Sequence, residues 1–193
     1  MNRLAHHFAT MAYNNAWANH RLLGAVARLS SDDFAAKRTS FFPSLKSTLN
    51  HIVTVDWFYV DALERAFRGE PTNPEARRFF EPDEPFDACA PLRAAQRAVD
   101  GRLVTLCASL TDDRLDTPVG VVWRSGVAHE RATRLLSHLF QHQIHHRGQA
   151  HAMLAGTEVA PPPLDEFFCA NEAAGRAAEL AELGYSEDLI WAR

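Results

Sequence analysis

Apolar residues recur at intervals of three and four along most of the chain, the spacing that gathers them on one face of an α-helix. The pattern predicts four long helices, over about residues 2–28, 44–68, 91–109 and 133–155. Ser44 suits the cap of the second helix, Thr133 or a neighbour suits the cap of the fourth, and Pro91 suits the first position of the third. Gly156 ends the fourth helix.

Three connecting segments depart from the helical pattern. Residues 30–33, Ser-Ser-Asp-Asp, predict a cap for a short further turn after the first helix. Residues 69–91 carry five prolines, many charges and little periodicity, so they predict a long surface crossover between the second and third helices. Residues 117–130 alternate loosely around a turn and predict a short two-stranded β-ribbon.

The C-terminal part continues with an amphipathic segment over about residues 169–183 and a tail. We expect Leu189, Ile190 and Trp191 of the tail to dock on the helices, because a disordered end would expose them. The fold class predicted is all-α. Its architecture is a four-helix bundle with a long crossover between helices two and three, a short β-ribbon before helix four and a C-terminal helix and tail, in one domain over residues 1–193.

Bulk composition is that of an ordinary soluble globular protein, with 47% hydrophobic and 23% charged residues. The formal charge is −4, and the 20 Lys and Arg residues form no basic run, so no nucleic-acid partner is predicted. Three cysteines in no CxxC arrangement fit a reducing cytoplasm. We expect a cytoplasmic protein without membrane contact, since neither a signal-peptide core nor a stretch of about 18 uncharged apolar residues is found.

The fourth predicted helix holds five of the ten histidines. His138, His142 and His146 stand at i, i+4 and i+8, which places them along one side of the helix. The apolar stripe passes through His146 and has His142 at its edge, whereas His138 and His145 lie toward the rim and His151 lies opposite. Two histidines one turn apart can share a metal ion, and the inner pair here is His142 with His146.

A third ligand has to come from another element, because two imidazoles bind a transition metal weakly. His51 lies near the apolar stripe of the second helix and is the only histidine between His20 and His129. Taken alone, His51 is better explained as a buried, hydrogen-bonded imidazole, and a lone HxxxH pair as part of a histidine-rich surface helix. Together with His142 and His146, however, His51 becomes the natural third ligand.

Four motifs resemble those of the DinB family of helical metal-binding proteins. They are Leu49-Asn50-His51-Ile52, His142-x-x-x-His146-Arg147-Gly148-Gln149, Tyr13-Asn14 with Trp17-Ala18-Asn19, and Asp188-Leu189-Ile190. The histidine triad with its HRGQ segment is the most specific part. The resemblance implies a four-helix bundle with a crossover, a divalent metal on His51, His142 and His146, and a homodimer. The family name refers to induction by DNA damage, but the charge pattern gives no support for DNA contact.

Members of this superfamily include thiol S-transferases that use low-molecular-weight thiols, a maleylpyruvate isomerase and candidate hydrolases, so the resemblance implies no single reaction. Three neutral imidazoles leave a cation its full charge and an open position, where water or a thiol can lose a proton near neutral pH. Zinc suits a tetrahedral site of this kind, and nickel suits one with added waters. We expect a metal-dependent hydrolase or thiol S-transferase acting on a small molecule, with a low-molecular-weight thiol as a further cofactor in the second case.

Two other functions fit the same residues: a non-catalytic metal-binding or small-molecule-binding protein of a stress response, and a metal-free helical partner domain. No catalytic residue is assigned from the sequence. Candidates for a general base or substrate clamp are His138, His145, Gln149, Asn14 and Trp17, and each is better explained by packing or hydrogen bonding. Aromatic residues of the first helix could supply the homodimer interface, although core packing explains the same pattern.

Overall fold

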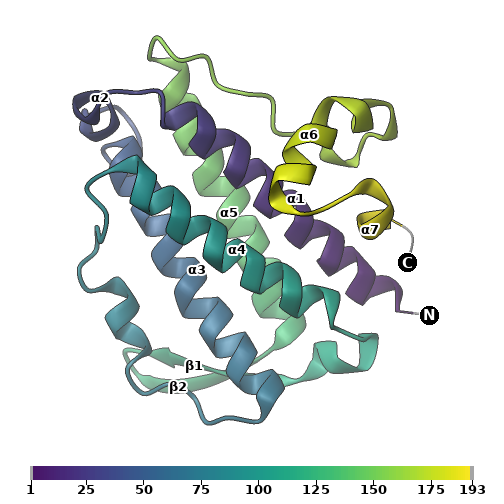
Figure 1. Ribbon diagram of the computed structural model, residues 1–193. Coiled ribbons are helices and arrows are strands. Elements are labelled where there is room, and N and C mark those ends of the chain that lie inside the picture. Colours follow the sequence, from purple (N-terminus) through teal and green to yellow (C-terminus); the bar gives the residue numbers. More distant parts are fainter. Residues whose placement is uncertain (1, 192–193) are drawn as a thin grey trace.

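Four long helices form the bundle in the computed structural model, which describes residues 2–191 (Figure 1). They are α1 (Arg3–Val26), α3 (Leu45–Arg68), α4 (Cys89–Ala108) and α5 (Ala132–Ala155). Helix α1 packs on α4 and α5, and α3 packs on the same two helices, so α1 and α3 stand at opposite corners. The predicted four-helix bundle is confirmed.

Shorter elements connect and cover the bundle. They are α2 (Ser31–Ala35), the 3₁₀ helices η1 (Ala76–Phe80), η2 (Asp112–Asp116), η3 (Glu166–Phe168) and η4 (Ala170–Glu172), the strands β1 (Pro118–Trp123) and β2 (Gly126–Arg131), and the helices α6 (Ala173–Leu183) and α7 (Glu187–Trp191). The two strands pair antiparallel, which confirms the predicted ribbon. Within residues 2–191, none of the helices has the length and apolar character needed to cross a bilayer.

The start of α3 follows the expected capping chemistry. The Ser44 hydroxyl accepts a hydrogen bond from the Ser47 amide at 3.0 Å, which satisfies one of the free amides of the first turn. The helix ends at Gly69, whose φ of 70° lies in the left-handed region that glycine adopts without a Cβ clash. Ser30 caps α2 in the same way, by accepting from the Asp33 amide.

Two expectations about helix starts are wrong. Thr133 does not cap α5: its hydroxyl donates to the Leu115 carbonyl at 2.6 Å, and Arg131 precedes the helix without a side-chain cap. Strand β2 leads directly into α5, and the Ala132 amide donates to the Thr117 carbonyl, so ribbon pairing takes the place of a cap. Pro91 is the third rather than the first residue of α4, still within the turn whose amides have no intrahelical acceptor.

The crossover after α3 returns to the end of the bundle where α3 began, so α3 and α4 run parallel (Figure 1). Asn50 holds the returning chain in place. Its side-chain amide donates to the Phe86 carbonyl and its side-chain oxygen accepts from the Phe86 amide, both at 2.9 Å. Asn50 precedes His51 in the chain, so the crossover is fastened beside one of the predicted ligands.

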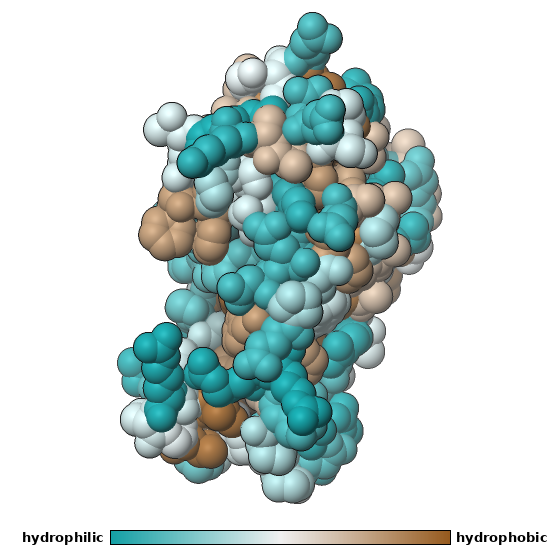
Figure 2. Space-filling view, turned by 90° about the vertical axis from the view of Figure 1, so that its left-hand side faces the viewer, coloured by the Kyte–Doolittle hydropathy of each residue, from teal (hydrophilic) through white to brown (hydrophobic). Residues whose placement is uncertain are grey.

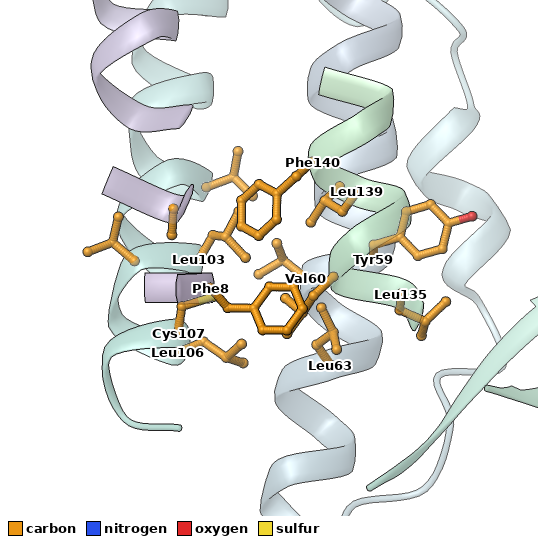
Figure 3. Close-up of a cluster of buried hydrophobic side chains, with 14 of the residues drawn as sticks. Phe8, Tyr59, Val60, Leu63, Leu103, Leu106, Cys107, Leu135, Leu139 and Phe140 are labelled. Atoms are coloured by element: carbon orange, nitrogen blue, oxygen red, sulfur yellow. The ribbon is translucent and has the colours of Figure 1, made fainter. Parts of the chain in front are cut away.

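Leucine and aromatic side chains from all four long helices fill the centre of the bundle (Figure 3). Phe8 of α1 stacks on Phe140 of α5, with ring centroids 6.3 Å apart. Leu139 is fully buried, and its replacement by alanine would cost about 2–5 kcal/mol of stability. Tyr59 lies at the edge of this cluster, and its hydroxyl points away from it (Figure 3).

The C-terminal elements dock on α1. Glu179 of α6 accepts hydrogen bonds from the Trp17 indole at 2.7 Å and from the Arg21 guanidinium at 2.9 Å. The docking expected of the tail is correct for Ile190, which is 1% exposed, and wrong for Leu189, which is 43% exposed. Trp191 is 38% exposed but packs one side of its ring on Phe167, with centroids 6.1 Å apart. The reason is geometric, since adjacent residues of the short helix α7 face in different directions and Leu189 faces away from the core.

Candidate metal centre

Three imidazoles from two adjacent helices meet at one point. His51 comes from α3, and His142 and His146 come from successive turns of α5. One ring nitrogen from each lies within 4.8 Å of the other two, and the Nε2 atoms of His51 and His142 are 2.9 Å apart. The structure thus brings together the three residues singled out in the sequence.

Burial along α5 follows the order expected from its apolar stripe. His146 is buried, His142 is half-buried, and His138 and His145 are exposed. The ring of His138 still lies close to the site, with its centroid 6.1 Å from that of His142. His151 faces elsewhere and forms a 2.9 Å hydrogen bond to the Pro162 carbonyl.

Gln149 fixes the orientation of His146. Its side-chain oxygen lies 2.8 Å from Nδ1 of His146 and, being an acceptor only, requires that this nitrogen carry the proton. The lone pair of His146 is therefore on Nε2. The His145 ring packs edge-on against His146, with centroids 4.8 Å apart, and its Nε2 lies 3.1 Å from the Gln149 amide nitrogen.

The imidazoles are held in their neutral form. Burial, followed by the neighbouring His146, lowers the pKa of His51 to about 4. Burial and the surrounding histidines lower the pKa of His142 to about 3, and burial also lowers the pKa of His146. At neutral pH each ring keeps a lone pair, the form in which imidazole binds a metal ion.

The connector before α3 covers one side of the cluster. The ring of Phe42 lies 4.4 Å from that of His51 and 5.5 Å from that of His146, measured between centroids. Phe41 is 78% exposed and contributes little cover. Two cavities lie beside His51. One of about 280 Å³ also reaches His138 and His142, and the other of about 330 Å³ lies between Phe42 and the crossover.

Several polar residues of the quoted motifs lie in the bundle core instead of at the histidines. Arg147 is 5% exposed, and its guanidinium donates to the side-chain oxygens of Asn15 at 2.7 Å and Asn19 at 2.9 Å. The amide nitrogens of both asparagines donate in turn to the carboxylate of Asp100 at 3.1 Å. The Asn-rich segment of α1 and the arginine of HRGQ thus tie α1, α4 and α5 together.

A second buried carboxyl group extends this network to α3. Asp56 accepts hydrogen bonds from the side-chain amides of Gln96 and Gln143 through one oxygen, while its other oxygen has no partner within residues 2–191. Burial raises the pKa of Asp56 to about 7 and raises that of Asp100 well above its usual range. This network was not predicted from the sequence, although a polar residue on an apolar stripe, such as Asp56 between Ile52 and Val60, is a visible signal of it.

The remaining candidates for a base or clamp lie away from the imidazoles. Trp17 is fully buried against Phe167, and its indole nitrogen is bonded to Glu179. Asn14 lines a different cavity, beside Gly148. Core packing and hydrogen bonding therefore account for Trp17, as expected from the sequence.

Comparison with known proteins agrees with the geometry. The family model described as DinB family matches residues 1–178. The chain is also 27% identical over 169 residues to "Protein DinB" of Bacillus subtilis (strain 168), a match that covers 82% of this chain and 91% of that relative. Matched over most of its length, from the start of α1 into α6, and carrying three convergent histidines on α3 and α5, this chain belongs to the DinB family.

Proposed function

We propose that the chain binds one divalent metal ion through His51, His142 and His146, and that it is a metal-dependent hydrolase or thiol S-transferase acting on a small molecule. The observation that carries the proposal is the convergence of three neutral imidazoles beside an open cavity. A closed structural site would use a fourth protein ligand, and among residues 2–191 the cluster has three.

The residues present fit such an ion. Ligand nitrogens around a tetrahedral zinc lie about 3.3 Å apart, as the usual zinc to nitrogen distance requires. The Nε2 atoms of His51 and His142 are 2.9 Å apart, and all three ligand atoms lie within 4.8 Å, so small side-chain movements suffice. An ion held this way would supply the positive charge that makes a bound water or thiol acidic near neutral pH.

The chain's own residues would orient the ligands and handle protons. Gln149 holds His146 with Nε2 free, and Phe42 keeps water from one side of the cluster. Of the two rim histidines, His138 lies in the cavity beside His142, whereas His145 contacts Gln149. We therefore favour His138 as the group that exchanges a proton with substrate.

Elemental analysis of untagged protein tests the metal site. About one divalent ion per folded chain is expected, with zinc and nickel the best candidates for the chemistry of three imidazoles. The variants His51→Ala and His142→Ala should lose the ion while keeping the helical circular dichroism spectrum. His129→Ala, a histidine change on strand β2, is the matched control and should keep it. Metal retention in both cluster variants contradicts the proposal.

Turnover separates an enzyme from a binding protein of a stress response. Thiol transfer and ester or amide hydrolysis should appear with metal-loaded protein and disappear with a chelator. Metal binding without any turnover would favour the non-catalytic alternative. The homodimer implied by the family resemblance stays a prediction for sedimentation analysis. The α1 aromatic residues Phe8, Tyr13 and Trp17 are buried within one chain, so an interface would use other side chains.

A further inference from the structure

The cavity beside His142 is lined mainly by aromatic side chains, with one arginine among them. Helix α3 contributes Phe58 and Tyr59, the crossover contributes Phe80 and Arg77 from η1, and strand β1 contributes Trp123. Phe58 lies at the centre of this wall, with its ring centroid 5.2 Å from that of Phe80 and 6.4 Å from that of Trp123. Most of the wall is therefore aromatic, and the imidazoles of His51 and His142 form its inner end.

Arg77 is the only lining residue of this cavity that carries a permanent charge. Its guanidinium has no hydrogen bond or ion pair with any residue between 2 and 191, whereas the adjacent Arg78 pairs with Glu75 at 3.0 Å. Arginine offers a planar fork of donors that matches a carboxylate. Arg77 is exposed and is thus available to an acidic group at the outer end of a largely aromatic cavity.

The second cavity beside His51 has the opposite charge. It is lined by Asp83 and Glu84 of the crossover, and the Glu84 carboxylate already pairs with Lys46 at 3.2 Å. An anion would be repelled by Asp83 on that side and attracted by Arg77 on the other. Charge alone therefore assigns an anionic molecule to the cavity of His142.

The surface over α3 and the crossover mixes hydrophobic and hydrophilic residues (Figure 2). Figure 2 views the side of the molecule on which α3 and the crossover lie, and hydrophobic residues appear there as small patches bordered by hydrophilic ones. The cavity volume of about 280 Å³ is slightly below the range of about 300–1,000 Å³ that accepts drug-sized molecules. The cavity suits a molecule with one ring and a short acidic side chain.

We propose that the substrate is a small organic acid with an aromatic or otherwise apolar body, whose acid group binds Arg77 and whose body packs between Phe58, Phe80 and Trp123. This inference rests on the proposed function only in calling the molecule a substrate. Arg77, His51 and His142 line the same cavity, so a molecule that spans it from Arg77 has its other end beside the two imidazoles.

Two probes of equal shape test the assignment: 3-phenylpropionate, an anion, and 3-phenylpropionamide, its neutral counterpart. Binding is measured by isothermal titration calorimetry on metal-free protein, because a carboxylate could otherwise bind the metal directly. The anion should bind about fivefold more tightly, the effect of one partly exposed charge pair. Arg77→Gln should remove this preference and Arg78→Gln, the matched control, should keep it. Trp123→Ala should weaken both probes alike.

Equal affinities for the two probes, no binding of either, or a preference that survives Arg77→Gln would overturn the inference. An equal loss of the preference in Arg78→Gln would also overturn the inference. The preference for the anion would then depend on the net charge of this surface and not on a contact inside the cavity. Because binding is measured on metal-free protein, the preference for the anion does not depend on whether the purified protein contains metal. An Arg77-dependent preference in a protein that holds no metal after purification would contradict the proposed function alone, and a metal-loaded protein without the preference would contradict this inference alone.

Discussion

The Nε2 atoms of His51 and His142 lie 2.9 Å apart, although 91 positions separate the two residues in the chain. Between the end of α3 and the start of α5 lie the crossover, α4, η2 and the ribbon, and of these only α4 is a long helix of the bundle. The crossover and the ribbon both return to the cluster, where they supply Arg77 and Trp123 as walls of its cavity. The bundle therefore positions the imidazoles, and the two irregular insertions determine what can reach them.

Replacing Gln149 with alanine tests how His146 is oriented. The variant loses the acceptor that holds the proton on Nδ1 of His146, so this ring can rotate and can adopt the other tautomer. We expect metal affinity to fall by about 10-fold or more, as is typical when a partner of a ligating histidine is removed. Competition against a chromogenic chelator measures the affinity.

Gln141→Ala is the matched control for Gln149→Ala. Gln141 lies two turns earlier on α5, is exposed, and no hydrogen bond of its side chain is found within residues 2–191. Its replacement should leave metal affinity unchanged. Equal affinities in the two variants would show that Gln149 has no orienting role.

Phe42 should control how quickly metal leaves the site. Its ring covers His51 and His146, so Phe42→Ala opens the cluster to water and to chelators without removing a ligand. We expect the rate of metal transfer to excess EDTA to rise several-fold, with the same stoichiometry at saturation. Phe41→Ala, which changes the exposed neighbour, should transfer metal at the original rate. An unchanged rate for Phe42→Ala would mean that the connector does not gate access.

Long periodic helices and the two ligand-bearing turns could be predicted from the sequence because both depend on spacing alone. Placing His142 and His146 on one face of α5 needs only the helical repeat, and His51 was identified by its position on the stripe of α3. The Thr133 cap could not be predicted correctly, because the start of α5 is set by pairing between β1 and β2, a contact between distant segments. A local capping signal has no information about such pairing.

The lining of the cavities and the partners within the buried polar network could not be predicted from the sequence. Arg77 lies in a segment without periodicity, so nothing assigns it to the neighbourhood of His142 until the crossover is seen to fold back along α3. The position of Asp56 on the apolar stripe of α3 is a signal of burial, but it does not name the partners of Asp56 or of Asp100. Their burial is understandable only once side chains from α1, α4 and α5 are seen to bond them.

Arg147 should contribute strongly to stability because it is the buried cation of the core network. In Arg147→Met the side-chain oxygens of Asn15 and Asn19 lose their donor and stay buried. We expect the free energy of unfolding in urea to fall by about 2–4 kcal/mol, because each buried acceptor left without a partner costs about 1–3 kcal/mol. If the free energy of unfolding fell only as much as for an exposed ion pair, Arg147 would not have this role in the core.

An exposed arginine on the same helix provides the comparison for Arg147. Arg134 pairs with Glu130 at 3.0 Å near the start of α5, and its side chain is largely exposed. Arg134→Ala should lower the free energy of unfolding by less than about 1 kcal/mol, because solvent screens such a pair.

Ionisation of Asp56 should make the free energy of unfolding depend on pH. Burial raises its pKa to about 7 in the folded protein, against about 3.9 when unfolded, so the folded state binds more protons between these two values. Stability from this group is thus fully present below about pH 4 and is lost as pH rises toward 7, by up to about 1.4 kcal/mol per pH unit. In the variant Asp56→Asn this loss is absent.

The difference between variant and wild type isolates this effect from the histidines. His51 and His142 have lowered pKa values of about 4 and 3, so their contribution has the opposite sign and grows as pH rises toward 6.5. Both proteins contain these histidines, and urea unfolding in the presence of chelator removes any metal contribution. Asp56→Asn should therefore gain stability relative to wild type as pH rises from 4 to 7, whereas the exposed control Asp113→Asn should give a flat difference. A flat difference for Asp56→Asn would show that this carboxyl group is ionised throughout the range, with Arg147 compensating its charge in the core.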